Sequence, residues 1–477
     1  MTGPGGRLLF AAVIAVAAAG LIRYNRSRED KRQPLRLRGY AYTSVLGLQM
    51  LPFYLVFRFL LSSAFDRALN WQGAFMEAMM IAAHVAVFDA VMLLLLPLLR
   101  RRISAAVCAA LWFLPNVLHL RLLPYTSNGP LFLLRMSERT ARTAALVWLA
   151  GFAAVMLWRT AEHLRFRRRL IRGAVPVPKQ VSALWRASLA QLGEDRVRGL
   201  VVTPVIASPL TAGLFSHVMA LPDRAYTEEE LRLIFLHELV HVQRRDSGKK
   251  FFMTFFTALC WFDPLVWIAM RRAGEDTELG CDETVLQGTD AETRRKYADL
   301  LLKTAGDGRG FTTCLSASAS GLRYRLRQVM APGKKAAGAV VAAVLVFALV
   351  LSYGVWCPTV EQGRLGDRYF TGADPVSFRS ITVSDRDTGA VSQGSCADEA
   401  ALREYLAGLP LYLSAGSLPL HGDCVTVTCR FGSGRTAILT LCRNAILINE
   451  IEKTNSRGAW YHGVGLDLDY VMSLIKT

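Results

Sequence analysis

Six segments of this chain are apolar enough to cross a lipid bilayer, and they constrain its fold more than any other feature. They occupy residues 7–22, 40–62, 76–98, 104–123, 142–158 and 337–356. A helix needs about 20 residues to span the hydrocarbon core, and lipid leaves its backbone only internal hydrogen bonds. The hydrophobic content of 52% exceeds that of a typical soluble domain. We therefore predict a multi-pass α-helical membrane protein.

Basic residues are concentrated in alternate connections between these segments. The basic connections are residues 23–38, Arg100–Arg102, residues 159–172 and Lys334-Lys335. Residues 63–75, in contrast, contain a single basic residue, Arg67. Basic connections tend to stay in the cytoplasm. The alternation predicts a bacterial plasma-membrane protein with its N-terminus outside, residues 159–335 in the cytoplasm and residues 357–477 outside.

The net charge of +18 follows the same pattern, so it does not indicate direct binding of nucleic acid. Residues 357–477 carry 11 Lys/Arg and 13 Asp/Glu, a balance of −2, so the positive excess lies beside the apolar segments. Five of the nine cysteines follow the last span, which indicates an oxidising compartment without fixing their pairing. No small-residue cleavage site follows the first span, so we expect a retained helix.

These observations divide the chain into four parts. We predict an N-terminal transmembrane region of about five helices, a cytoplasmic domain, a further span and an extracytoplasmic sensor domain, at residues 1–158, 159–335, 336–356 and 357–477 respectively. Both folded domains are expected to be α+β. Short strands are predicted at 200–202 and 217–221, and a helix at 178–193.

A second helix of the cytoplasmic domain has a clear start signal. Thr227 is followed three residues later by Glu230, which is the pattern of a capping box. The helix is expected to run to about Arg245. Residues 251–270 are also apolar, but Asp263-Pro264 interrupts them and a seventh span would break the charge pattern. We interpret them as two buried or membrane-skimming helices.

The sensor domain shows strand-like runs between turn residues. The predicted strands are 381–384, 424–431, 436–442 and 445–449, and the predicted helices are 397–408 and 466–475.

Four ionisable residues fall within the predicted spans: Arg58, Glu77, His84 and Asp89. Intramembrane charge often marks a functional site. Arg58 and Glu77 lie near the outer side, where they can pair or extend to the interface, so we favour a structural role. His84 and Asp89 do not stand at metal-ligand spacing with another residue.

The motif His237-Glu238-Leu239-Val240-His241 lies on the capped helix. Histidines at positions i and i+4 share one helical face and can bind one Zn²⁺. Glu238 can reach a water beside the metal and act as general base, then as proton donor to the leaving amine. The alternative is that the two histidines lie on the surface of a charged helix and bind no metal.

A catalytic zinc site needs a third protein ligand. On a helix, Glu275, Glu278 and Asp282 share one face downstream of the motif. We assign Glu278 as the ligand and Asp282 as a residue that holds a ligand histidine in its tautomer. Asp246 is either a similar support or a cap. A solvated acidic face is the alternative reading of this spacing.

Two further features, a cysteine and a short strand, lie near the motif in the sequence. Cys281 can be a thiolate ligand or a redox switch, but a buried inert cysteine is the favoured interpretation. Residues 214–221 precede the motif helix, and an edge strand there can pair with an extended peptide. This hypothesis assigns substrate contact to Leu214, Val218 and Ala220.

These residues together resemble the BlaR/MecR family of membrane metallopeptidases. The resemblance rests on Gly213-Leu214 through Pro222, on His237-Glu238-x-x-His241 with Arg244-Arg245-Asp246, on Asp263-Pro264, and on Glu278-x-x-Cys281-Asp282. It implies a gluzincin-type fold, one zinc per chain bound by His237, His241 and Glu278, and a catalytic Glu238. It also implies an outer domain that activates the inner protease, which then cleaves itself or a DNA-binding repressor.

The sequence departs from the β-lactam sensors of that family. It has more spans before the peptidase domain, and its outer domain lacks the penicillin-binding elements. The one Ser-x-x-Lys, at Ser473–Lys476, is followed only by Thr477. We therefore do not expect the signal to be a β-lactam.

The expected partners are a protein or peptide substrate, membrane lipid and an unidentified extracytoplasmic ligand. A repressor as substrate and a homodimer stay open. Two other functions stay open as well: a catalytically silent receptor or scaffold with this fold, and a membrane quality-control protease. Glu238 and Glu278 favour a peptidase, because a silent receptor is free to lose them, and residues 357–477 favour signalling.

Overall fold

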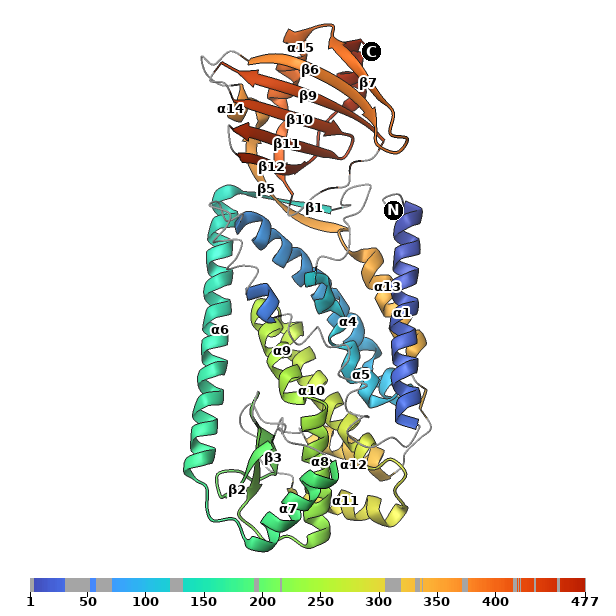
Figure 1. Cartoon of the computed structure of the whole chain (residues 1–477), viewed down its shortest axis with the longest axis vertical. Helices are drawn as coiled ribbons and strands as arrows, with labels where there is room; N and C mark the ends of the chain where they lie inside the picture. Colours follow the sequence, from blue (N-terminus) through green and yellow to red (C-terminus); the bar gives the residue numbers. More distant parts are fainter. Residues whose placement is uncertain are drawn as a thin grey trace.

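The computed structural model describes residues 4–30, 52–56, 71–120, 132–192, 197–214, 217–304, 319–330, 335–336, 338–370, 376–414, 418, 420, 422–432, 435–452 and 455–476. Figure 1 shows a β-sheet domain at one end, long helices in the middle and a smaller α+β region at the other end. Most of the predicted span 40–62, including Arg58, lies outside the described residues. The described part of it, residues 52–56, is helical.

Two described helices are long and apolar enough to cross a membrane. They are α4 (Trp71–Arg102) and α6 (Glu138–Arg172). Helices α1 (Pro4–Asp30) and α13 (Ala339–Ser352) contain shorter apolar stretches and pack together through a small cluster that includes Ala11 and Val346. The described residues therefore contain fewer full-length membrane helices than the six spans predicted.

The predicted span 104–123 is not one helix. Helix α5 (Ala105–Leu111) is short, and the 3-10 helix η2 (Leu114–Leu120) follows it. Pro115 has no N–H to donate to the carbonyl of Leu111, four residues before it, so the α-helix does not continue past this point. Helix α5 packs against helix α10 (Pro264–Val285), where a Cβ at Gly280 would lie only 3.1 Å from Ala106 Cα. This segment is therefore partly a packing element of the α+β region.

Residues 251–270 form two helices, as the Asp263-Pro264 interruption predicts. Helix α9 (Asp246–Leu259) ends before the break, and α10 begins at Pro264 with Asp263 as its N-cap. Asp263 Oδ1 accepts a hydrogen bond from Leu265 N at 2.9 Å. Proline suits the first helical position because its missing N–H would have no partner there.

The tip of this helical hairpin is fixed against the apolar part of α6. Trp148 Nε1 donates to Leu259 O at 2.8 Å, and Trp261 Nε1 donates to Trp148 O at 3.1 Å. The Trp261 ring lies directly over Gly151, so that a Cβ there would overlap it. The hairpin thus connects the long helix α6 to the α+β region.

The α+β region contains a three-stranded sheet in the order β2-β4-β3. Its strands are β2 (Val197–Thr203), β3 (Leu210–Ala212) and β4 (His217–Pro222). Its other helices are α7 (Lys179–Leu192), α8 (Glu228–Gln243), α11 (Ala291–Thr304) and α12 (Ala319–Met330). Phe235 and Leu239 of α8 are buried against this sheet and α7, so the core fixes the motif helix.

The predicted edge strand is wrong. Strand β4 pairs with β2 on one side and β3 on the other, so Val218 and Ala220 lie on the central strand. Leu214 lies in the connection between β3 and β4. The error arose because the short strand β3 carries no alternating pattern: all three of its residues are buried.

Strand β1 and the C-terminal residues together form a ten-stranded sheet in the order β1-β5-β8-β12-β11-β10-β9-β6-β7-β13. The strands are β1 (Phe132–Ser137), β5 (Trp356–Arg364), β6 (Val376–Asp385), β7 (Val391–Cys396), β8 (Pro410–Leu413), β9 (Asp423–Phe431), β10 (Thr436–Cys442), β11 (Ala445–Glu452), β12 (Asn455–His462) and β13 (Ile475–Lys476). The helices are α14 (Leu365–Tyr369), α15 (Glu399–Gly408) and α16 (Leu468–Ser473). Cys424 and Cys442, directly opposite on β9 and β10, form a disulfide.

Strand β1 comes from before α6 and was not predicted. It pairs in parallel with β5, which follows α13. The sheet also meets the start of α4, where Gln362 Nε2 donates to Gln72 Oε1 at 2.9 Å and Gln72 Nε2 donates to Glu138 Oε1 at 3.2 Å. The sheet domain therefore contacts the first turns of both long helices.

The three ionisable residues that the sequence places within the predicted span 76–98, Glu77, His84 and Asp89, are buried in α4. His84 has both ring nitrogens 2.7 Å from backbone carbonyl oxygens, those of Met80 and Ser352. Glu77 and Asp89 are 8% and 3% exposed. His84 thus joins α4 to the end of α13, which is a structural role.

The hairpin contact generates a stability prediction. Gly151→Ala should destabilise the full chain in detergent by about 1–3 kcal/mol, because a methyl group must displace the Trp261 ring. Gly20→Ala on α1 is the matched control, since no heavy atom lies within 4 Å of a Cβ there. Thermal unfolding measures both, and equal melting temperatures for the two variants would contradict the packing described.

Candidate metal centre

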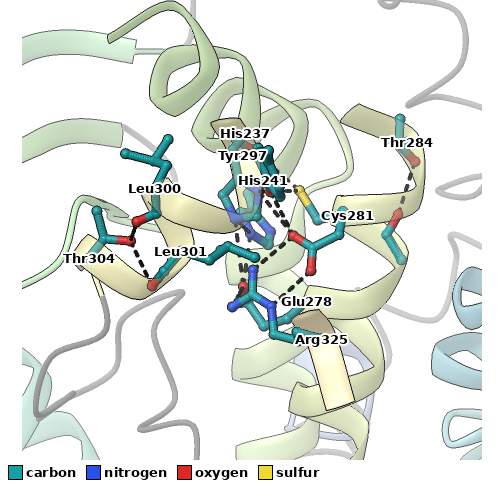
Figure 2. Close-up of polar contacts among 12 residues, drawn as sticks. His237, His241, Glu278, Cys281, Thr284, Tyr297, Leu300, Leu301, Thr304 and Arg325 are labelled. Carbon is teal, nitrogen blue, oxygen red and sulfur yellow. Dashed lines mark hydrogen bonds and ion pairs between the residues drawn. The ribbon is translucent and has the colours of Figure 1, made fainter. Parts of the chain in front are cut away.

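Helix α8 places both motif histidines on one face. Its capping box is complete: Thr227 Oγ1 accepts from Glu230 N at 3.2 Å, and Glu230 Oε2 accepts from Thr227 N at 2.8 Å. The predicted helix is confirmed, with bounds Glu228–Gln243. His237 Nε2 and His241 Nε2 face each other at 3.1 Å, as Figure 2 shows.

Glu278 of α10 lies beside both of these nitrogens. Its Oε2 is 3.6 Å from His237 Nε2, and its Oε1 is 3.6 Å from His241 Nε2. Spacing and resemblance predict Glu278 beside the histidines, and the crossing of α8 and α10 brings them together.

The other ring nitrogen of His241 faces Asp246, the first residue of α9. His241 Nδ1 and Asp246 Oδ2 are 2.7 Å apart, and Lys249 Nζ lies 2.6 Å from Asp246 Oδ1. Burial alone would raise the pKa of Asp246, but Lys249 and His241 hold that pKa well below its usual value. An ionised carboxylate only accepts, so the proton of neutral His241 sits on Nδ1.

His237 is held in the same way through an intermediate residue. Tyr297 OH of α11 lies 2.8 Å from His237 Nδ1 and donates to Asp282 Oδ1 at 2.7 Å. Since the hydroxyl has one proton and gives it to Asp282, His237 Nδ1 must donate to the tyrosine oxygen. Asp282 itself is 3.7 Å from His237 Nδ1. The predicted support of a histidine by Asp282 therefore passes through Tyr297.

Sequence reasoning missed Tyr297. It lies beyond the acidic motif on a separate helix, and no spacing rule connects it to His237. Its complete burial, with 2% exposure, is the signal that only the fold supplies.

When both histidines are neutral, these contacts direct each Nε2 lone pair at the other ring and at the Glu278 carboxylate. Glu278 Oε1 is buried without a hydrogen-bond partner. Two acceptor nitrogens and a carboxylate in such proximity are unfavourable unless a cation lies among them. Imidazole nitrogens with one carboxylate are a donor set that zinc binds in catalytic sites. The residues therefore fit a metal ion.

Cys281 lies closer to the centre than the inert interpretation implies. Its Sγ and one nitrogen of each histidine lie within 4.8 Å of one another. The thiol, however, faces the protonated side of His237, 3.4 Å from Nδ1, and donates to His237 O at 3.4 Å. Glu278 faces the lone pairs, so the carboxylate is the better-placed third ligand.

Glu238 is buried beside the histidines, with 3% exposure. Its position next to His237 on α8 follows from the motif, and hydrophobic neighbours Leu239 and Val240 are buried on the same stretch of helix. A carboxylate in a largely dry site is suited to accept and return a proton.

A buried charge network fixes the helix that carries Glu278. Arg100 Nε of α4 donates to Asp276 Oδ1 at 2.6 Å, and Trp112 Nε1 donates to Asp276 Oδ2 at 2.8 Å. Burial raises the pKa of Asp276 to about 6, although Arg100 opposes the shift. The network holds α10 against α4 and against Trp112 at the end of α5. Asp276 stands less than one helical turn before Glu278.

Part of this chain is similar to known proteins. Residues 127–329 match the family described as BlaR1 peptidase M56. The regulatory protein BlaR1 of Bacillus licheniformis is 27% identical over 181 residues, 38% of this chain and 30% of that protein. The methicillin resistance mecR1 protein of Staphylococcus aureus is 29% identical over 101 residues, 20% of this chain and 17% of that protein. The matched stretches thus span less than a third of either relative.

The support of His241 generates a prediction about metal affinity. Asp246→Asn should weaken metal binding about 10–100-fold, because the amide no longer fixes the Nδ1 proton or compensates Lys249. Asp299→Asn, an exposed acid on α11, is the control for the loss of one negative charge. Competition with a metal chelator measures the affinities. Equal affinities for the two variants would show that Asp246 only ends the preceding turn.

Proposed function

We propose that this chain, whose residues 127–329 belong to the BlaR1 M56 family of metallopeptidases, is a membrane-bound zinc endopeptidase that transduces an extracytoplasmic signal. The convergence of two imidazole lone pairs and the Glu278 carboxylate carries the proposal. His237, His241 and Glu278 hold the zinc, and Glu238 is the catalytic acid–base.

The chemistry follows from these positions. Zinc supplies a Lewis acid that polarises the scissile carbonyl and makes water more acidic. Glu238 takes a proton from the attacking water and returns it to the departing amine nitrogen. Asp246 and Tyr297 keep the Nδ1 protons of the histidines in place, so that both Nε2 atoms stay available.

The substrate is a protein segment in extended conformation. Strand β3 contacts α8, and no described strand pairs with its outer edge. Its backbone can therefore add the substrate as a further strand, in place of the incorrectly predicted β4. The substrate itself is this chain or a DNA-binding repressor. One relative bears the name of a regulatory protein, which supports the second choice.

The architecture supports a role in transmembrane signalling. The ten-stranded sheet lies at one end of α6, and helices α8, α11 and α12, which carry residues of the metal centre, lie toward the other end (Figure 1). Strand β1 precedes α6 and strand β5 follows α13, so their pairing joins residues before α6 to the domain at residues 357–477, which is predicted to be extracytoplasmic. The domain is the proposed sensor, and its ligand is a separate molecule from the peptide substrate.

Two substitutions test the peptidase. Glu238→Ala should abolish cleavage of the chain and of a co-expressed repressor encoded beside it in the genome. The metal content should stay at one zinc per chain. His237→Ala should lose both cleavage and zinc. Glu229→Ala on the same helix, an exposed residue paired with Lys296, should leave both unchanged. Immunoblots measure the fragments, and metal analysis of the purified chain measures zinc.

Identical fragments from wild type and Glu238→Ala would remove the peptidase assignment. Zinc bound equally by wild type and His237→Ala would remove the ligand assignment. Zinc binding without any Glu238-dependent cleavage would support the silent receptor instead.

A further inference from the structure

Arg325 of α12 holds Asp282 with two hydrogen bonds. Its Nε donates to Asp282 Oδ2 and its Nη2 donates to Asp282 Oδ1, both at 2.8 Å. Its Nη1 lies 3.5 Å from Glu278 Oε2 (Figure 2). The side chain of Arg325 is 15% exposed, so water screens these interactions little. The two parallel bonds fix the plane of the Asp282 carboxylate as well as its position.

A fixed cation beside a metal centre is unexpected on electrostatic grounds. Arg325 repels a bound Zn²⁺ and competes with it for the Glu278 carboxylate. Its presence is better explained by the orientation it imposes. Through Asp282 and Tyr297 it fixes the direction of His237, and through its own contact it fixes Glu278.

The segment that carries Arg325 leads into helix α13. After α12, Lys335 Nζ contacts Glu283 Oε1 at 2.6 Å, so adjacent acids of α10 are each held by a base from this segment. Ala336 N then donates to Arg102 O at 2.8 Å, and Ala336 O accepts from Ser104 N at 3.3 Å. Helix α13 follows and ends at the sheet domain through β5. The metal centre is thus tied to the chain that enters the sheet domain.

We propose that Arg325 is a positioning residue of the metal centre, and that with Lys335 it couples the arrangement of the ligands to helix α13. The inference rests on the proposed function, because it concerns the same zinc site. A change in the position of either base relative to α10 would change the direction of His237 and Glu278 without any change in their sequence neighbours.

The test compares three substitutions that each remove one positive charge from this segment. They are Arg325→Gln, Lys335→Gln and Arg327→Gln, the last being an exposed residue of the same helix. Zinc affinity of the purified full chain is measured by chelator competition, and the visible spectrum of the cobalt-substituted chain reports the ligand arrangement. Thermal unfolding with chelator present measures folding separately.

Arg325→Gln should lower zinc affinity about 10–100-fold and alter the cobalt spectrum. Lys335→Gln should also lower zinc affinity, but by a smaller factor, because Lys335 contacts Glu283, the residue after Asp282, and not Asp282 itself. Arg327→Gln should match wild type. Arg325→Lys keeps the charge and loses the paired bonds, so it should also weaken binding, and it is the substitute variant if Arg325→Gln does not fold.

The sign of the effect separates positioning from charge alone. If Arg325 acted only as a nearby cation, its removal would strengthen zinc binding, and that result would overturn the proposal. Affinity equal to that of Arg327→Gln would overturn it as well. If Arg325 acts through Asp282, the Asp282→Asn/Arg325→Gln double variant should bind no more weakly than the worse single variant, whereas additive losses would contradict that route.

His237→Ala distinguishes this inference from the proposed function. Zinc binding that is lost in His237→Ala but unaffected in Arg325→Gln refutes the role of Arg325 alone. Zinc binding that is equal in wild type and His237→Ala refutes the metal centre, and the role of Arg325 falls with it.

Discussion

Two neutral imidazoles repel each other when their lone pairs meet, and in the centre of this protein the Nε2 atoms of His237 and His241 lie 3.1 Å apart. The pair is maintained because each histidine donates a hydrogen bond from its Nδ1 atom, His241 to Asp246 and His237 to Tyr297. A buried carboxylate oxygen of Glu278 adds a third acceptor with no partner. A bound cation resolves this arrangement, and the packing of α8, α9, α10 and α11 serves to keep it in place.

The sequence contained much of this centre because helices impose fixed spacing. The His237–His241 pair, the capping box at Thr227 and the acidic residues of α10 are all local patterns, and a period of 3.6 residues is enough to place them. Asp246 was also recognised, since it follows the motif helix directly. Its contact with His241 follows from the sharp turn at Arg245, whose φ of 53° is left-handed.

The parts that were missed depend on contacts between elements far apart in the chain. Tyr297 and Arg325 come from α11 and α12, and nothing in the local pattern joins either residue to His237. The predicted edge strand failed because the three buried residues of β3 show no alternation. The segment predicted as one helix at 104–123 is divided at Pro115, and hydropathy alone cannot show that its first part packs against α10. Strand β1 was missed because it is a short segment before α6 whose pairing partner, β5, lies more than 200 residues further along the chain.

The most direct test is X-ray absorption at the zinc edge of the purified full chain. The account predicts a first shell of nitrogen and oxygen only, with zinc–nitrogen distances of about 2.0–2.1 Å from His237 and His241. A sulfur shell at about 2.3 Å would contradict it. That result would make Cys281, and not Glu278, the third ligand.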